Sequence, residues 1–310
     1  VIVLTGRDKG AERAAKLADL ASGAIGILVG THAVFQKGVA FRDLRLAVVD
    51  EQHRFGVAQR MELGAKGQAT DVLVMTATPI PRSLALASYG DMDVSVLDEK
   101  PPGRQPVRTV LVAAERLDEV VGSLARAVAE GRQAYWVCPL VEDSETLDLA
   151  STEARFAHLR RVLGEDAVGL VHGQMPAADK DAAMARFVAG RCQVLVATTV
   201  IEVGVNVPNA SIMVIEGAET FGLAQLHQLR GRVGRGAALS TCVLLYRGPL
   251  GETAARRLRT LRDSEDGFAI AEEDLAIRGA GDLIGMAQSG LPRFRIADLE
   301  RQAALMAVAQ

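Results

Sequence analysis

Short apolar runs recur along this chain, and longer segments with a helical pattern separate them. Most of these runs are too short and too continuously apolar for an amphipathic helix, so they predict strands buried on both faces. The expected strands are Val1–Leu4, Ile25–Val29, Leu46–Val49, Val72–Met75, Val94–Leu97, Val107–Val112, Ala134–Cys138, Val168–Val171, Val194–Ala197, Ile212–Ile215 and Cys242–Tyr246. The expected helices between them include Ala11–Leu20, Arg116–Ala129, Thr152–Leu163 and Ala177–Val188. This alternation predicts an α/β fold, in which helices cover both sides of a parallel sheet.

The composition is that of a globular protein. The chain has 310 residues, of which 49% are hydrophobic and 24% are charged, which indicates about two domains with large cores. No apolar run reaches the roughly 18 residues that span a bilayer, and no signal-peptide pattern is present, so we expect a cytoplasmic protein that does not enter a membrane. The net charge is −3, so a nucleic acid would have to be met by local basic patches.

The cysteines and histidines favour neither a disulfide nor a metal site. Cys138, Cys192 and Cys242 are far apart in the sequence, and two of them lie in apolar runs, which is typical of buried structural cysteine. The five histidines lack the spacing of metal ligands.

Two breaks divide the chain. Asp98–Pro106 contains three prolines and a glycine, which cannot continue a helix or a central strand, so we interpret it as a hinge between two α/β domains. After Tyr246 the strands stop, two helical patterns follow at Arg256–Asp263 and Phe268–Ile277, and a glycine-rich loop, RGAGD and then GMAQSG, comes next. We therefore expect a first domain at 1–100, a second at 101–248, and a helical hairpin with a loop at 249–310. Because the chain opens inside an apolar strand rather than on methionine, we expect the first domain to be incomplete.

Two acids follow a predicted strand directly. Leu46–Val49 ends in Asp50 and Glu51, and the carboxyl edge of a parallel sheet is where ligands bind. There Asp50 could hold Mg²⁺ through water, and Glu51 could orient or deprotonate an attacking water. The simple alternative is a strand end with two solvated acids.

Small polar residues follow two other predicted strands. They are Thr76 and Thr78 after the fourth strand, and Thr198, Thr199, Gly204 and Asn206 after the ninth. Thr76 and Thr78 could relay contacts between a nucleotide site and a second ligand. At the second turn, hydroxyl groups and backbone N–H groups suit phosphate oxygens of a nucleotide or of DNA. Thr78 could equally be an ordinary helix N-cap, and the second turn could be a loop without a ligand.

The segment QLHQLRGRVGRG places Arg230, Arg232 and Arg235 among glycines. Arginine makes planar, bidentate contacts with phosphate and can stabilise transition-state charge. The glycines let the backbone approach a ligand closely. The pattern favours a phosphate site over a merely solvated basic face.

The order of these motifs resembles that of superfamily 2 helicases, in which two RecA-like domains sandwich ATP. DEQH resembles motif II, TAT motif III, TTVIEVGVN motif V and QLRGRVGR motif VI. The longer stretches DEQHRFGVAQR, MTATPIPRSLALASYGDMDVSVLDEKPPGRQP, HGQM and DGFAIAEEDLAIRGAGDLIGMAQSG are similar to the RecG family. The resemblance covers essentially the whole chain. It implies two RecA-like parallel-sheet domains, the first incomplete, followed by the hairpin and loop that link ATP turnover to movement of DNA.

The resemblance also implies roles for individual residues. Asp50 would hold Mg²⁺ and Glu51 would activate water, while Gln228, Arg232 and Arg235 would reach the γ-phosphate. The expected nucleotide-site residues are Asp50, Glu51, His53, Gly204, Asn206, Gln228, Arg232 and Arg235. The expected DNA contacts and coupling residues are Gly30, Thr31, His32, Thr76, Thr78, Thr198, Thr199, Arg257, Arg278 and Gln288. Arg257 as a helix surface charge and Gln288 as an ordinary loop residue are the plain alternatives.

The sequence departs from the family pattern in three places. No GxxxxGK[ST] phosphate loop occurs in the chain; the family has it upstream, together with a wedge domain that grips branched DNA. Asn206 stands where the family usually has aspartate, and Thr220 stands where it usually has arginine. These changes put one nucleotide contact and one ionic contact in doubt.

The sequence thus predicts an ATP- and Mg²⁺-dependent translocase on double-stranded DNA that acts on forks and Holliday junctions. We expect a monomer, with single-strand-binding protein as a further candidate partner, and no ATPase from this chain alone. One rival is the transcription-repair coupling factor, which shares the hairpin but is expected to have DEE in place of DEQ and to lack the DVSVLDEKPPGR run. The other is a non-catalytic homologue that binds DNA or a partner, to which Asn206 and Thr220 give some weight.

Overall fold

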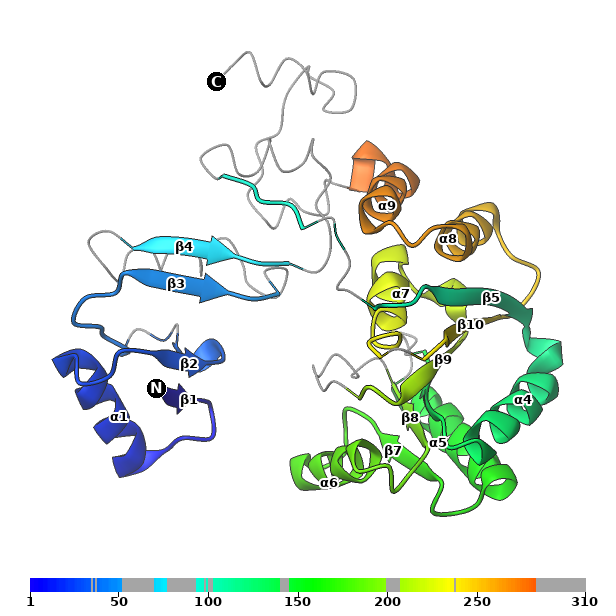
Figure 1. Cartoon of the computed structure of the whole chain (residues 1–310), viewed down its shortest axis with the longest axis horizontal. Helices are drawn as coiled ribbons and strands as arrows, with labels where there is room; N and C mark the ends of the chain where they lie inside the picture. The colour runs from blue at the N-terminus through cyan, green and yellow to red at the C-terminus, as the bar shows by residue number, and fades with distance from the viewer. Residues whose placement is uncertain are drawn as a thin grey trace, which may run out of the picture. The chain divides into compact units, whose positions relative to one another are not determined.

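The protein was analysed as a computed structural model. It describes residues 1–34, 36, 38–51, 70–76, 93–97, 99, 103–139, 145–198, 207–236 and 238–282, with the backbone alone at His32, 145–149 and 278–282. These residues fall into two compact units, one within the first 76 residues and the other from residue 93 to Asp282 (Figure 1).

The first unit contains four short parallel strands. Its elements are β1 (Ile2–Leu4), α1 (Gly10–Ser22), β2 (Leu28–Gly30), the 3-10 turn η1 (His32–Val34), β3 (Leu46–Val49) and β4 (Asp71–Val74). β1 pairs with β2, and β3 pairs with β4. Leu4 lies opposite Gly30, and Val49 lies opposite Val74. The predicted parallel pairing is therefore confirmed for these strands.

The prediction of strands buried on both faces is wrong for β3 and β4. In β3, Ala47 and Val49 are buried, whereas Leu46 and Val48 are more than half exposed. Leu73, opposite Val48 in β4, is also half exposed. Successive side chains of a strand point to opposite faces, so one face of this pair is covered and the other is open in the described residues.

The second unit is built on six strands and the helices that connect them. Its elements are β5 (Val107–Ala113), η3 (Ala114–Arg116), α4 (Leu117–Ala129), β6 (Gln133–Val137), α5 (Glu145–Leu163), β7 (Val168–Val171), α6 (Ala177–Val188), β8 (Val194–Ala197), β9 (Ala210–Glu216), η4 (Ala218–Thr220), α7 (Leu223–Arg230), β10 (Ser240–Tyr246), α8 (Glu252–Asp263) and α9 (Gly267–Asp282). The strands are all parallel and lie in the order β5-β10-β9-β6-β8-β7. Parallel neighbours require crossover connections, which the helices provide.

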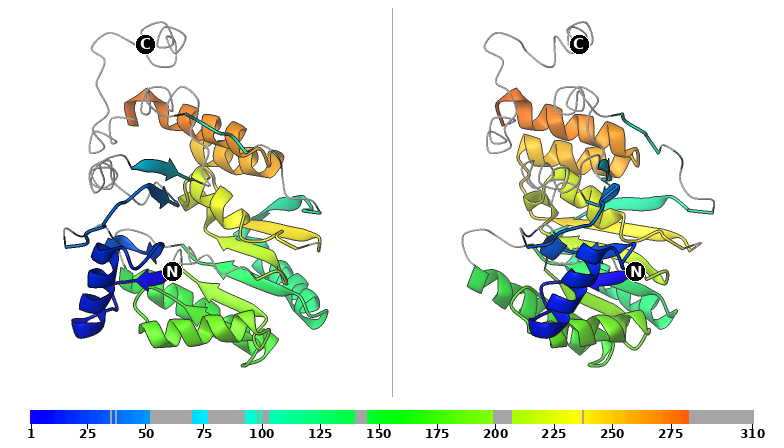
Figure 2. Two further views of the ribbon diagram at one scale, coloured as in Figure 1. Left: turned by 60° about the vertical axis from the view of Figure 1, so that its left-hand side comes forward. Right: turned by 90° about the vertical axis from the view of Figure 1, so that its left-hand side faces the viewer.

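Helices cover both faces of this sheet (Figures 1 and 2). On one face α4 and α5 pack over Trp136, which is fully buried. On the other face α6, α7, α8 and α9 enclose a second core, in which the rings of Tyr135 and Phe187 lie 4.9 Å apart. Burying one such large apolar side chain contributes roughly 1.5–3 kcal/mol, so the two cores fix the helices on the sheet. In Figure 2, α8 and α9 lie side by side next to α7.

Three expectations about local structure fail. The second strand begins at Leu28 rather than Ile25. Val94–Leu97 forms no strand; its residues are exposed, Leu97 to 92%. RGAGD is not a loop, because α9 continues through it to Asp282. A glycine inside a helix costs roughly 1 kcal/mol relative to alanine, and the packing of α9 on α7 and α8 outweighs that local preference.

Among the described residues, no helix is both long and apolar enough to cross a bilayer.

Candidate nucleotide and DNA sites

The carboxyl edge of β3 and β4 brings the two acids close to Thr76. The N–H of Met75 donates to the carbonyl of Val49 over 2.8 Å, so Asp50 and Glu51 leave one strand where Thr76 leaves its neighbour. Glu51 donates its backbone N–H to Asp50 Oδ1 over 2.9 Å. Asp50 is exposed at this edge, and a solvated carboxylate suits Mg²⁺, which binds through one or two carboxylates and keeps several waters.

Glu51 has an unusual backbone. Its φ is +52°, the only positive φ outside glycine among the described residues. This left-handed conformation costs of order 1–3 kcal/mol for residues with a side chain, and such strained positions cluster at active sites. The turn therefore holds the second acid at a fixed place beyond the strand end.

The predicted DNA-gripping motif lies at the edge of β1 and β2. A Cβ atom on Gly30 would stand 2.4 Å from the carbonyl oxygen of Leu4 and 2.3 Å from Cγ2 of Val34. No side chain fits there, so glycine is required by the close approach of the two strands and η1. Thr31 follows at the surface and is exposed; the backbone of His32 begins η1.

In the second unit, Thr198 lies at the carboxyl edge of β8. Its backbone N–H donates to the carbonyl of Val171 in β7 over 3.3 Å. The side chain is only 2% exposed, and its hydroxyl makes no hydrogen bond. A buried hydroxyl without a partner costs roughly 1–3 kcal/mol. Such a group is a candidate contact for a ligand, which is consistent with the predicted DNA contact.

The predicted phosphate-binding arginines lie in the turn after α7. Gly234 has φ +75°, and its missing Cβ would stand 2.6 Å from Cγ2 of Val107. Arg235 is exposed, and its Nε donates to the carbonyl of Gly231 over 3.3 Å. Burial lowers the pKa of Arg235, as do the neighbouring cations Arg232 and Arg104. The turn therefore gathers positive charge at one place, as a phosphate site requires.

Arg230 does not belong with these two arginines, although the sequence groups them. It is 4% exposed, and its Nη1 donates to the carbonyls of Leu261 over 2.6 Å and Ser264 over 2.7 Å. Its Nη2 lies 3.1 Å from Nδ1 of His227. The guanidinium thus satisfies carbonyls at the end of α8, which have no partner within the helix. Arg230 has a structural role between α7 and the hairpin.

Arg257 of α8 makes a second link between the hairpin and the segment before α7. Its Nη1 donates to the carbonyl of Phe221 over 2.6 Å, and its Nη2 lies 3.4 Å from that of Glu219. The simple reading as a helix surface charge is therefore wrong. Thr220, where the family usually has arginine, donates its hydroxyl to the carbonyl of Gly217 over 2.8 Å.

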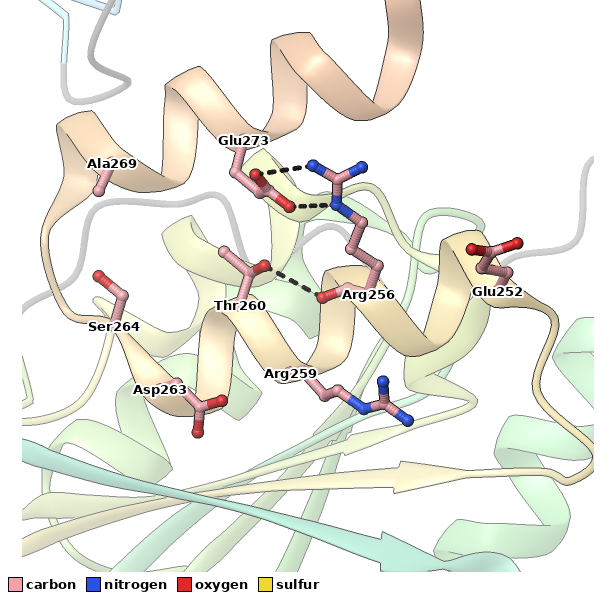
Figure 3. Close-up of a pocket in the computed structure, with 8 residues that line it drawn as sticks. All are labelled: Glu252, Arg256, Arg259, Thr260, Asp263, Ser264, Ala269 and Glu273. Carbon is pink, nitrogen blue, oxygen red and sulfur yellow. Dashed lines mark hydrogen bonds and ion pairs between the residues drawn. The ribbon is translucent and has the colours of Figure 1, made fainter.

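The two hairpin helices are also tied to each other across a shallow groove (Figure 3). Arg256 of α8 and Glu273 of α9 point toward one another and form a two-pronged ion pair. Thr260 donates its hydroxyl to the carbonyl of Arg256 over 3.1 Å. Acidic and basic groups both line the groove, so it carries no single charge that would select a ligand. We assign it to bracing the hairpin.

Several predicted site residues lie outside the described part of the chain. They are His53, Thr78, Thr199, Gly204, Asn206 and Gln288, and for Arg278 only the backbone, within α9, is described. Gln228 is half-buried on α7, two residues before Arg230. Two contacts were not predicted from the sequence. The carboxylate of Glu265 accepts the backbone N–H of Val107, and Arg155 and Glu216 form a bidentate pair at 2.8 and 2.7 Å. These partners are far apart in the sequence.

Family profiles match three stretches of the chain. They are the DEAD/DEAH box helicase at residues 1–86, the helicase conserved C-terminal domain at 114–237, and "ATP-dependent DNA helicase RecG, domain 3, C-terminal" at 264–310. A solved structure of Mycobacterium smegmatis helicase Lhr, bound to single-stranded DNA and AMP-PNP, has a TM-score of 0.59 at 15% identity over 99% of this chain and 40% of that one. At that identity it shows the fold alone. The fold, and the position of the sequence motifs at the carboxyl edges of the strands, are those of a helicase built on RecA-like domains.

The relatives at higher identity define the family more narrowly. The ATP-dependent DNA helicase RecG of Escherichia coli K12 is 54% identical over 98% of this chain, and that of Bacillus subtilis is 50% identical over 96%. A structure of RecG bound to a three-way DNA junction matches with a TM-score of 0.72 and 44% identity, over 98% of this chain and 39% of that one. Over almost its whole length, the sequence of this chain is therefore similar to the RecG helicases. It spans 44% of the length of those two relatives.

Proposed function

We propose that this chain is the motor part of an ATP-dependent helicase that moves along double-stranded DNA and remodels branched DNA. The observation that carries the proposal is the RecG-like sequence, 54% identical over 98% of the chain, together with acids, hydroxyls and arginines at the expected sheet edges and turns. The similar solved structure is RecG bound to a three-way DNA junction. Forks and Holliday junctions are the substrates that we propose for this chain.

The described residues suit the parts of an ATP site. Asp50 would hold Mg²⁺ through water, and Glu51, fixed by its left-handed backbone, would orient the attacking water. Arg232 and Arg235 would stabilise the charge that develops on the γ-phosphate. Mg²⁺, when bound, would neutralise phosphate charge, and the protein groups would position the reactants.

The remaining assignments concern DNA and the arrangement of domains. We propose that Thr31, Thr76 and Thr198 contact the DNA backbone or couple it to the ATP site, because each follows the end of a strand. Thr31 is exposed there, and the hydroxyl of Thr198 has no hydrogen-bond partner. We propose domain limits at 1–100, 101–248 and 249–310, with the hinge before β5. A monomer in the cytoplasm, and a further contact with single-strand-binding protein, complete the proposal.

The direct test uses a full-length protein that joins this chain to the upstream region found in its relatives. We expect ATP-dependent unwinding of a three-way junction or a synthetic fork, and no unwinding of a blunt linear duplex. A Glu51→Gln variant controls for contaminating ATPase and should bind the junction without unwinding it. Equal activity of wild type and Glu51→Gln would contradict the proposal.

A second measurement separates the two rival functions. The 310-residue chain by itself lacks a phosphate loop, so we expect it to show no DNA-stimulated ATPase above the Glu51→Gln control. A non-catalytic homologue would lack turnover in the full-length protein as well. A coupling-factor type of translocase would hydrolyse ATP as a full-length protein but would not unwind the three-way junction or the fork.

A further inference from the structure

The first residue of β5 lies between two turns of the second unit. Val107 opens this strand, and residues 103–106 lead into it. A Cβ atom on Gly234, in the arginine turn (residues 231–235, after α7), would stand 2.6 Å from Cγ2 of Val107. The Val107 side chain therefore packs directly on the backbone of the arginine turn. Its backbone N–H donates to the carboxylate of Glu265, which lies in the turn between α8 and α9.

The turn between the two hairpin helices contains three polar residues, and two of them support the turn itself. The hydroxyl of Ser264 accepts the backbone N–H of Asp266 over 3.1 Å. Asp266 Oδ1 accepts the backbone N–H of Phe268, at the start of α9, over 2.8 Å. The third residue, Glu265, reaches the start of β5, 158 positions away in the sequence. Arg230 holds the same turn from α7, through the carbonyl of Ser264 at 2.7 Å.

The contact between Glu265 and Val107 is a specific one. Val107 is buried, and a buried backbone N–H is almost always paired. The strand order places β5 at an edge of the sheet, next to β10, so its outer side is open to a side chain from the hairpin. A carboxylate that accepts an N–H makes a charge-assisted hydrogen bond, which is roughly twice as strong as a neutral one. The bond thus fixes the hairpin turn to the first residue of the strand.

We propose that Glu265 is a positioning residue for the coupling of ATP turnover to DNA movement, because it ties the hairpin turn through Val107 to the arginine turn. Val107 is in direct contact with the arginine turn, so a shift of that turn on loss of the γ-phosphate would displace Val107. The hydrogen bond would pass the displacement to the hairpin, since close-packed contacts and hydrogen bonds carry such coupling. The inference rests on the proposed function and deepens it. The plain alternative is that Glu265 only stabilises the hairpin.

Four variants of the full-length protein separate these possibilities: Glu265→Ala, Glu265→Asp, Glu265→Gln and the control Glu272→Ala. Alanine removes the carboxylate. Aspartate keeps the charge but is one methylene shorter, which draws its oxygens back from the N–H of Val107. Glutamine keeps an oxygen acceptor at the same reach. Glu272 is an exposed carboxylate of α9, so its removal controls for the loss of negative charge from the hairpin.

DNA-dependent ATPase, fork unwinding and melting temperature are measured on the same preparations. We expect Glu265→Ala and Glu265→Asp to keep ATPase within about twofold of wild type and to lose about fivefold or more in unwinding per ATP, a size typical of residues that carry coupling. Glu265→Gln and Glu272→Ala should match wild type. The inference is overturned if the alanine and aspartate variants unwind as much per ATP as Glu272→Ala. A parallel loss of ATPase, unwinding and melting temperature would also overturn it, in favour of a purely stabilising role.

Hydrogen exchange tests the same link without relying on unwinding. In wild type, AMP-PNP should change the exchange of backbone amides in both residues 103–113 and residues 264–270. In Glu265→Ala and Glu265→Asp, only the first segment should respond. An equal response of residues 264–270 in the variants and in wild type, or no response of that segment in wild type, would contradict the inference. A wild-type protein that does not unwind forks would overturn the proposed function alone, and the exchange comparison would still decide the role of Glu265.

Discussion

The guanidinium of Arg230 lies 2.6 Å from the carbonyl oxygen of Leu261, so the last residue of α7 closes the end of α8. The same Nη1 also reaches the carbonyl of Ser264. Burial lowers the pKa of Arg230, but the hydrogen bonds to carbonyl oxygens favour its charged form. The helicase motif helix and the hairpin are thus joined by a buried cation.

Arg230→Met should destabilise the chain. The substitution leaves the carbonyls of Leu261 and Ser264 without their partner inside the protein, and losing such buried polar contacts costs roughly 3 kcal/mol or more. Urea denaturation measures the change. Arg262→Ala is the matched control, because Arg262 is exposed and pairs only with the adjacent Asp263; it should change stability by less than about 0.5 kcal/mol. Equal stability of both variants would show that Arg230 does not hold the hairpin.

Because of His227, the free energy of unfolding should decrease as the solution becomes acidic. Its pKa in the folded protein is about 4, because of burial and then the nearby Arg230 and Arg104, against an ordinary value of 6.5. The folded pKa is the lower of the two, so the unfolded chain binds the proton first, and stability is lost as the pH falls from about 6.5 to 4. The loss is on the order of 3 kcal/mol. In His227→Gln the unfolding free energy should vary less between these pH values; an identical pH profile would contradict the assignment.

Arg235→Ala in the full-length protein should abolish ATP hydrolysis with little loss of ATP affinity. An arginine that stabilises transition-state charge contributes about three to five orders of magnitude to the rate. Steady-state ATPase and equilibrium binding of AMP-PNP are measured on the same preparation. If turnover decreases less than tenfold, Arg235 does not stabilise the transition-state charge, and Arg232 becomes the candidate.

The hairpin should couple hydrolysis to movement of DNA. In the full-length protein, we expect Arg278→Ala or Gln288→Ala to leave DNA-dependent ATPase within severalfold of wild type while fork unwinding collapses. Arg230 of α7 binds the end of α8, and Arg257 of α8 binds the segment before α7, so the hairpin is connected to the helix that precedes the arginine turn. ATPase, unwinding and melting temperature are compared for each variant. A parallel loss of all three would mean that the hairpin only covers apolar surface.

The sequence predicted the architecture well because the patterns of α/β structure are local. The helix Ala177–Val188 was predicted with the bounds that the structure has, and the strands of the second unit agree within two residues. Apolar runs become strands here because each finds a parallel neighbour on the sheet. Val94–Leu97 has the same composition but no such neighbour among the described residues, and it forms no strand.

The sequence by itself determined the order of the motifs and the chemistry that they carry: acids after one strand, hydroxyls after others, and arginines among glycines. Only the tertiary structure decided which arginine does what. Arg230 and Arg235 stand five positions apart in one basic segment, yet one is buried against the end of α8 and the other is exposed beside Arg104. Burial and charge depend on neighbours from distant parts of the chain, which a local pattern does not contain.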